Sequence, residues 1–75
     1  MKKLIECDRG EQVRVLKLYA KDELKQRLIS FGLMKEAIVE VLEQAPAKQT
    51  IEVKVGKMRL ALRAQEAALI EVEAI

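Results

Sequence analysis

The segment from Thr50 to Arg63 (TIEVKVGKMRLALR) limits the possible folds of this chain more than any other part of the sequence. Apolar and polar residues alternate along it as far as Gly56 and alternate again after Lys57. Because successive residues of a β-strand point to opposite faces, this alternation predicts two strands that each have one apolar face. Glycine at the first central position favours a type II′ turn between them. The sequence therefore predicts a β-hairpin whose apolar face pairs Val55 with Met58, Val53 with Leu60 and Ile51 with Leu62.

The other face of this hairpin is basic. The same register places Lys54 opposite Arg59, and like charges directly across a strand pair are mildly destabilising. This face has two interpretations: a docking patch for an acidic partner, or a solvated face that Glu52 and Glu40 neutralise. Further basic residues that we expect nearby are Lys48, Lys57 and Arg63. Without aromatic residues between them, such residues are a poor platform for nucleic acid.

The remaining strand signals are short and lie on both sides of the hairpin. Residues Gln12–Tyr19 begin by alternating, but Leu16 and Leu18 fall on the face opposite Val13 and Val15, which predicts a bend or bulge near Leu16. The other expected elements are a strand over Ala37–Gln44, a turn over Ala45–Lys48 in which Pro46 ends the ladder, a single helical turn over Ala64–Ala68, and a last strand around Ile70 and Val72.

The residues from Lys21 to Leu33 change to a helical period. Their apolar stripe, with i, i+4 and i+7 spacing, consists of Leu24, Leu28 and Phe31. Asp22 is expected to cap the N-terminus of this helix, and Gly32 to end it, because glycine readily takes the left-handed conformation. Five short strands and one short helix in 75 residues predict a mainly β, single domain over residues 1–75. We expect a small closed SH3-like barrel whose helix plugs one mouth or covers one side.

Composition limits the chemistry that the chain can perform. There is no histidine, so the commonest general base at neutral pH and the commonest transition-metal ligand are both missing. The three glycines are far apart, so no glycine-rich phosphate loop occurs. The net charge of +2 gives little electrostatic reason to expect a nucleic-acid partner. The sequence therefore predicts a protein that is not an enzyme.

The same sequence predicts a cytoplasmic protein. A single cysteine, Cys7, cannot form an intramolecular disulfide and fits a reducing compartment; we expect its thiol to be partly buried and inert. The first residues, MKKLIECDRG, contain no apolar run long enough for a secretion signal. No stretch approaches the roughly 20 apolar residues of a transmembrane helix.

Several apolar side chains fall outside the predicted core. Ile29 lies about 100° from the helical stripe. Leu33 and Met34 follow the helix, and Leu16 and Leu18 point away from the first strand's core face. Two interpretations remain open. These side chains form an exposed patch for a partner protein, or they pack under the helix and seal the end of the barrel.

The stretch from Leu24 to Leu33 (LKQRLISFGL) resembles the family of ferrous iron transport protein A, FeoA. The family pattern there is a leucine, two residues, Arg-Leu, two residues, a large apolar residue and Gly-Leu. Other matching positions are Gly10, Ala45-Pro46, Ile51–Arg63 and Glu71-Val72. One departure is Met34-Lys35-Glu36, where the family often has Pro-Gly. The resemblance implies an SH3-like barrel of the bacterial cytoplasm that assists the membrane ferrous iron permease, FeoB, by protein–protein contact, without enzymatic activity or a cofactor.

The contact surface predicted for this partner has two parts. It comprises Arg27, Ile29 and Met34 at the helix and its exit, and Lys54, Lys57 and Arg59 at the hairpin tip. One alternative is a regulatory module like the C-terminal SH3-like domain of iron- or manganese-dependent repressors, although no DNA-binding helices precede the barrel here. A second alternative is a weak transition-metal carrier that uses Cys7 with Asp8 and Glu11. No catalytic residue is expected.

Overall fold

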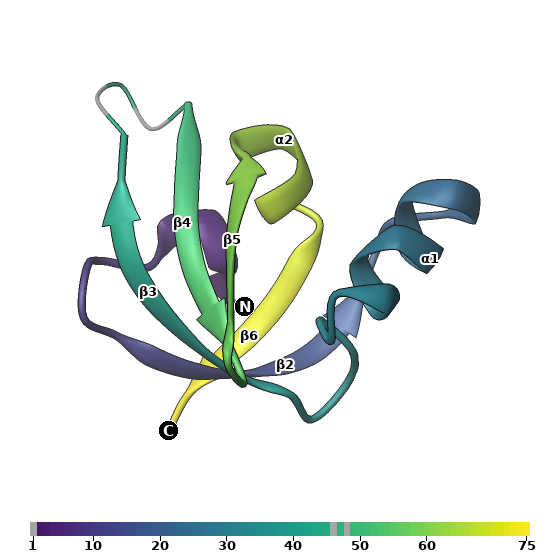
Figure 1. The fold of residues 1–75 in the computed structure, drawn as a ribbon, viewed down its shortest axis with the longest axis horizontal. Coiled ribbons are helices and arrows are strands. Elements are labelled where there is room, and N and C mark those ends of the chain that lie inside the picture. The colour runs from purple at the N-terminus through teal and green to yellow at the C-terminus, as the bar shows by residue number, and fades with distance from the viewer. Residues whose placement is uncertain (1, 46, 48) are drawn as a thin grey trace.

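Six strands form one curved antiparallel sheet in the computed structural model, which describes residues 2–45, 47 and 49–75 (Figure 1). The elements are β1 (Lys2–Lys3), the 3₁₀ helix η1 (Leu4–Glu6), β2 (Gln12–Leu18), α1 (Asp22–Ser30), β3 (Ile38–Gln44), β4 (Thr50–Val55), β5 (Met58–Arg63), α2 (Ala64–Ala67) and β6 (Ile70–Ala74). The strand order in the sheet is β1-β6-β2-β3-β4-β5. The prediction of a mainly β chain is confirmed.

The curved sheet is completed into a barrel by its short helices. Because the strand order is linear, β1 and β5 are the two edges of the sheet. The helical turn α2 contacts β4, β5 and η1, and η1 contacts β6, so these two elements lie across the gap between the edges. Figure 1 shows α1 standing to one side of the sheet, beyond the end of β2. The barrel is therefore closed by α2 and η1, and α1 is not needed to close it.

The core follows the two-residue period of the strands. The fully buried strand side chains are Val13, Val15, Val39, Val41, Ile51, Val53, Leu62, Ile70 and Val72. The β4–β5 register is the one predicted from the alternation, from Thr50 opposite Arg63 to Val55 opposite Met58. Gly56 has φ +59° whereas Lys57 is not left-handed, as a type II′ turn requires. At the tip, however, Met58 is 47% exposed, so the apolar face of the hairpin is not buried as far as the turn.

The predicted irregularity in β2 is a β-bulge at Leu16. Val15 lies opposite Val72 of β6 and Lys17 lies opposite Glu71, so Leu16 is the extra residue. The bulge shifts the alternation by one position. Leu18 therefore lies opposite the buried Ile70, on the core side of the sheet, and the expectation that it points away from Val13 and Val15 was wrong.

The two ends of α1 differ from each other in how well the sequence predicted them. Asp22 is not the N-cap: Lys21 takes that position without a side-chain hydrogen bond, and Asp22 is the first helical residue. The C-terminus is as predicted, with Gly32 at φ +93°. The Gly32 N–H donates to the Ile29 carbonyl and the Leu33 N–H to the Leu28 carbonyl, each at 2.9 Å, which is a Schellman motif.

The N-terminal segment was not predicted. Leu4 of η1 and Cys7 are both fully buried, so the thiol is more deeply placed than expected. The Gln44 side-chain amide donates to the Cys7 carbonyl, which ties this segment to β3. The turn predicted directly after Gln44 depends on Pro46 and Lys48, which lie outside the described residues.

Candidate functional site

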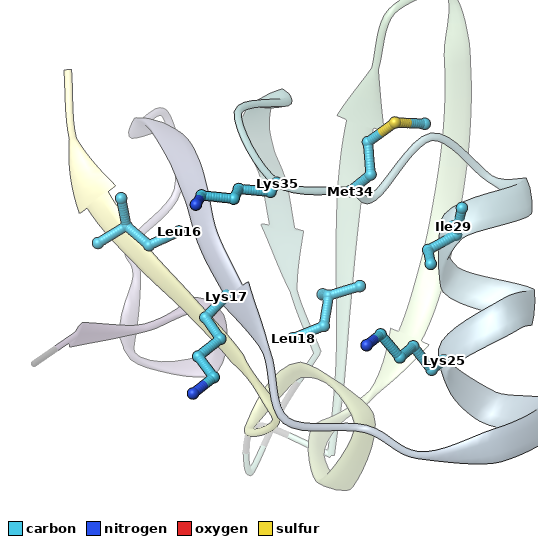
Figure 2. A pocket seen from close by; sticks show the side chains of 7 residues that line it. All are labelled: Leu16, Lys17, Leu18, Lys25, Ile29, Met34 and Lys35. Carbon is cyan, nitrogen blue, oxygen red and sulfur yellow. The ribbon is translucent and has the colours of Figure 1, made fainter.

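A groove of about 500 Å³ lies between α1 and β2 (Figure 2). Its lining residues are Leu16, Lys17, Leu18, Lys25, Ile29, Met34 and Lys35. Figure 2 shows Leu18 of β2 and Ile29 of α1 extending toward the same space, with the Lys25 ammonium group directed into it. The groove thus combines an apolar floor with a lysine rim, and none of its seven lining residues is acidic.

The bulge in β2 and the turn after α1 together build this groove. The bulge turns Leu18, the last residue of β2, to the core side of the sheet, and α1 stands beyond that end of β2 (Figure 1). After the Schellman turn the chain crosses to β2, where the Glu36 N–H donates to the Val15 carbonyl at 2.8 Å and the Val15 N–H donates to the Ala37 carbonyl at 2.9 Å. These two hydrogen bonds hold the preceding residues, Met34 and Lys35, over β2.

Two apolar side chains of the groove are accessible to solvent. Ile29 is 39% exposed and Met34 is 46% exposed. Only Leu28 of α1 is buried, and it anchors the helix to the core. Contiguous exposed apolar groups with a polar rim are typical of interaction sites. The interpretation of an exposed patch therefore describes Ile29 and Met34, whereas Leu33 belongs to the core.

The charges of the groove are not compensated within the described part of the chain. Lys25 and Lys35 make no ion pair there; the four pairs that the described residues form are Lys2–Glu11, Arg14–Glu73, Arg27–Glu66 and Arg59–Glu52. Lys17 is different, because its ammonium group lies 5.0 Å from the centroid of the Tyr19 ring. Lys25 and Lys35 are therefore the two lining lysines that have neither an ion pair nor a ring contact among the described residues.

Arg27 faces another part of the molecule. Its guanidinium donates to Oε2 of Glu66 on α2 at 2.5 Å. Oε1 of the same, largely buried Glu66 accepts the Arg63 backbone N–H at 3.0 Å. Arg27 thus connects α1 to α2 and does not line the groove.

The predicted residues of the hairpin tip lie apart from the groove. Arg59 donates to Oε1 of Glu52 at 2.5 Å, and Lys54 lies opposite Glu40 of β3 in the sheet. These are the two carboxylates that the sequence offered for neutralising this face. Lys54 also lines a second hollow of about 300 Å³, with Gln12, Ile38, Glu40 and Gly56. Lys57 is exposed at the turn.

The residues of the metal-carrier alternative are not assembled for a metal. Burial raises the pKa of the Cys7 thiol, and its Sγ lies 3.7 Å from the Lys3 carbonyl oxygen, to which it donates. Both carboxylate oxygens of Glu11 are occupied, one by the Asp8 N–H and one by the Lys2 ammonium, each at 2.7 Å. These two contacts lower the pKa of Glu11. Within residues 2–45, 47 and 49–75 there is no group of three Cys, Asp or Glu side chains placed to hold a metal ion.

Sequence reasoning missed the lysines of the groove. Lys25 lies four residues before Ile29, on the same helical face, so this neighbour could have been found from the helical period. Lys35 could not, because the path of the chain after Gly32 depends on its hydrogen bonds to β2.

Among the described residues, no helix has the length and apolar character needed to cross a membrane.

Comparison with protein families shows what this chain is similar to. The model of the FeoA domain family matches residues 2–74. A protein of Campylobacter jejuni, provisionally named Fe(2+) transport protein A, is 35% identical over 72 residues, which are 96% of this chain and 97% of the relative.

Solved structures agree with this comparison. Iron(II) transport protein A from Clostridium thermocellum superposes with a TM-score of 0.93 at 32% identity; the match covers 99% of this chain but only 46% of that protein. The zinc complex of FeoA from Stenotrophomonas maltophilia, described as an SH3 domain protein, superposes with a TM-score of 0.84 at 27% identity, over 97% of this chain and 91% of that one. The SH3-like fold prediction is confirmed. A manganese-dependent transcriptional repressor shares the fold at 20% identity, with a TM-score of 0.89 over 99% of this chain and 41% of that protein.

Proposed function

The chain belongs to the FeoA family of ferrous iron transport proteins, and from that premise we propose that it is a cytoplasmic, non-enzymatic accessory protein that acts by contacting the membrane ferrous iron permease, FeoB. The observation that supports this proposal most is the groove between α1 and β2. A concave apolar surface with a charged rim suits recognition of another macromolecule, and its lining contains no serine, cysteine, histidine or carboxylate side chain.

The main contact is assigned to Ile29 and Met34. An apolar side chain gains up to roughly 1.5–3 kcal/mol when it moves from full exposure to full burial. Both side chains are more than a third exposed, so a partner that covers them removes substantial apolar area from water. Arg27 contributes indirectly, since its ion pair with Glu66 holds α1 in place. The hairpin tip, with Lys54, Lys57 and Arg59, is proposed as a secondary contact.

Retention of tagged protein on membranes that contain the permease tests this proposal. The wild-type protein should be retained, and Ile29→Asp should abolish retention while leaving the fold intact. Ile38→Asp is the matched control, because Ile38 is a 46% exposed isoleucine outside the groove. Equal retention of the wild type by membranes with and without the permease would contradict the proposal. Equal loss for both variants would contradict the assignment to the groove.

A second candidate function is a stand-alone regulatory module. It is favoured by the fold shared with the manganese-dependent repressor, a likeness of fold alone at 20% identity. Co-purification of the chain with a repressor or with operator DNA from cells would favour this function over permease contact.

A further inference from the structure

We infer that the occupant of the groove is an amphipathic helix of the partner that places carboxylates beside its apolar anchors. This inference rests on the proposed function, in that the partner is taken to be a protein. It goes further by specifying the secondary structure and the charge of the segment that binds.

The backbone of β2 shows why the segment is helical. An extended peptide binds a sheet by pairing with an open edge, as in β-strand addition. β2 is an inner strand, however: β6 pairs with it as far as Leu18, while β3 and the crossing segment pair with it as far as Val15. The stretch left open on the β3 side, residues 16–18, is too short for a ladder, so most N–H and C=O groups of an extended segment there would lie unpaired over an apolar floor. A helix satisfies its backbone internally and needs only side-chain contacts.

The arrangement of the side chains that line the groove also suits a helix. Ile29 on α1 and Leu18 on β2 approach the same space from two elements, and Met34 borders it from the crossing segment (Figure 2). Apolar anchors spaced i, i+3 or i+4 and i+7 on one helix face are the usual way for a helix to fill such a groove.

The rim specifies the charge of the occupant. Lys25 and Lys35 form no ion pair among the residues that the structure describes, and no lining residue is acidic. Carboxylates that flank the apolar anchors would meet both ammonium groups. A basic segment would instead face uncompensated like charges at this rim.

Two other occupants fit less well. A flat anionic lipid surface would meet the lysines but could not reach the floor of a concave site. A second copy of this chain would need an exposed acidic and apolar helix face, whereas the exposed isoleucine of α1 is flanked by Lys25. Charge and shape together therefore favour an acidic helix from a different protein.

The test is an NMR titration of the isotope-labelled protein with designed peptides. Three peptides share leucines at i, i+3, i+4 and i+7 and carry Glu, Gln or Lys at all flanking positions; a fourth is the Glu peptide with a central proline. The Glu peptide should shift the methyl signals of Leu18, Ile29 and Met34, the Gln peptide should bind more weakly, and the Lys and proline peptides should not bind. Equal binding of the Glu and Lys peptides, or of the proline peptide and its parent, would overturn the inference.

Charge-reversed variants make the test specific. Lys25→Glu with Lys35→Glu should weaken binding of the Glu peptide by roughly 2- to 30-fold, as expected for two exposed ion pairs, and should improve binding of the Lys peptide. The matched control is Lys54→Glu with Lys57→Glu, which changes the net charge equally at the hairpin tip. A similar loss in both double variants would assign the effect to overall charge and overturn the inference.

Vesicles of phosphatidylglycerol and phosphatidylcholine should leave the NMR signals of the groove residues unchanged. Shifts of these signals with vesicles but not with the Glu peptide would overturn the inference in favour of a lipid surface.

Failure of this inference can be told apart from failure of the proposed function. If membranes containing the permease retain the wild type and Ile29→Asp abolishes retention, the proposed function stands. In that case, unchanged retention of Lys25→Glu with Lys35→Glu overturns only the acidic helix. If the permease has no effect on retention but the Glu peptide binds in the groove, the proposed function fails while the inferred peptide chemistry holds.

Discussion

The tip of the β4–β5 hairpin and the groove between α1 and β2 have similar composition but differ in what surrounds their charges. Each region exposes a methionine to nearly the same extent, 47% for Met58 and 46% for Met34. At the hairpin, Arg59 is paired with Glu52, and Lys54 lies opposite Glu40. At the groove, neither Lys25 nor Lys35 has an ion-pair partner within the described residues.

The difference shows that the number of basic residues in a segment does not measure the charge that the segment offers to a partner. A strand places its neighbours across a ladder, so a basic residue in the hairpin meets the carboxylates of adjacent strands. Lys25 and Lys35 of the groove come from a protruding helix and a crossing segment, which have no strand ladder beside them. The groove is therefore expected to dominate partner binding. The following variants test this, in decreasing order of expected effect.

The largest effect is expected from Leu28→Ala, which removes the anchor of the helix that lines the groove. Leu28 is the one buried residue of α1, and its truncation should lower the free energy of unfolding by about 2–5 kcal/mol. Urea unfolding followed by circular dichroism measures this loss. Leu24→Ala, at a half-buried position of the same helix, is the control and should cost less. A loss below about 1 kcal/mol for Leu28→Ala would contradict its role as the anchor of α1.

The next effect is expected at the apolar floor, where Met34→Asp is compared with Met58→Asp. The two methionines are equally exposed, so both substitutions should change the free energy of unfolding by less than about 0.5 kcal/mol. Only Met34→Asp should strongly reduce retention on permease-containing membranes, because it places a charge in the groove. A stronger loss for Met58→Asp would reverse the ranking of the two regions.

A third effect concerns the turn that shapes the groove. Gly32 has φ +93°, and a Cβ there would lie 3.2 Å from Cγ1 of Val55, so Gly32→Ala combines backbone strain with a close contact. Gly10→Ala is the matched control, because Gly10 has φ +91° with no atom within 4 Å of such a Cβ. Both variants should lose about 1–2 kcal/mol to strain, and Gly32→Ala should lose more. Thermal unfolding checks this, and equal losses would show that the contact with Val55 is relieved at no cost.

The smallest effect is expected from charge reversal at the hairpin, Lys54→Glu with Arg59→Glu. Because Arg59 is already paired with Glu52 and Lys54 lies across the ladder from Glu40, ferrous iron uptake in cells should fall only a few-fold, and less than with Lys25→Glu and Lys35→Glu. Uptake of radiolabelled Fe²⁺ by cells that carry each variant measures both. A greater loss for the hairpin variant would make the secondary contact the principal one.

The sequence was sufficient to predict the elements whose determinants are local. The Thr50–Arg63 register follows from alternation around Gly56, and the end of α1 follows from Gly32. The β-bulge was predicted because the apolar pattern changes face near Leu16, but the direction of Leu18 after it was not. That direction depends on pairing with β6, which is more than 50 residues away in the chain.

The candidate site was predicted only in part, for the same reason. Ile29 and Met34 could be named because they are off the helical stripe or beyond the helix. Arg27 looked equally suitable, yet it pairs with Glu66 on α2, a partner that no local pattern indicates. The burial of Leu4 and Cys7 was likewise hidden, since η1 is buried by elements from the far end of the chain.

Site-specific photo-crosslinking in cells tests the central claim most directly. A photoreactive amino acid would replace Ile29 or Met34 in the groove and, as controls, Ile38 or Met58 at equally exposed positions outside it. We expect strong crosslinks to the permease from both groove positions and weaker ones from Ile38 and Met58, which lie at or beside the secondary contact proposed at the hairpin tip. Crosslinks from Ile38 or Met58 alone would contradict the claim that the groove is the surface through which this protein acts.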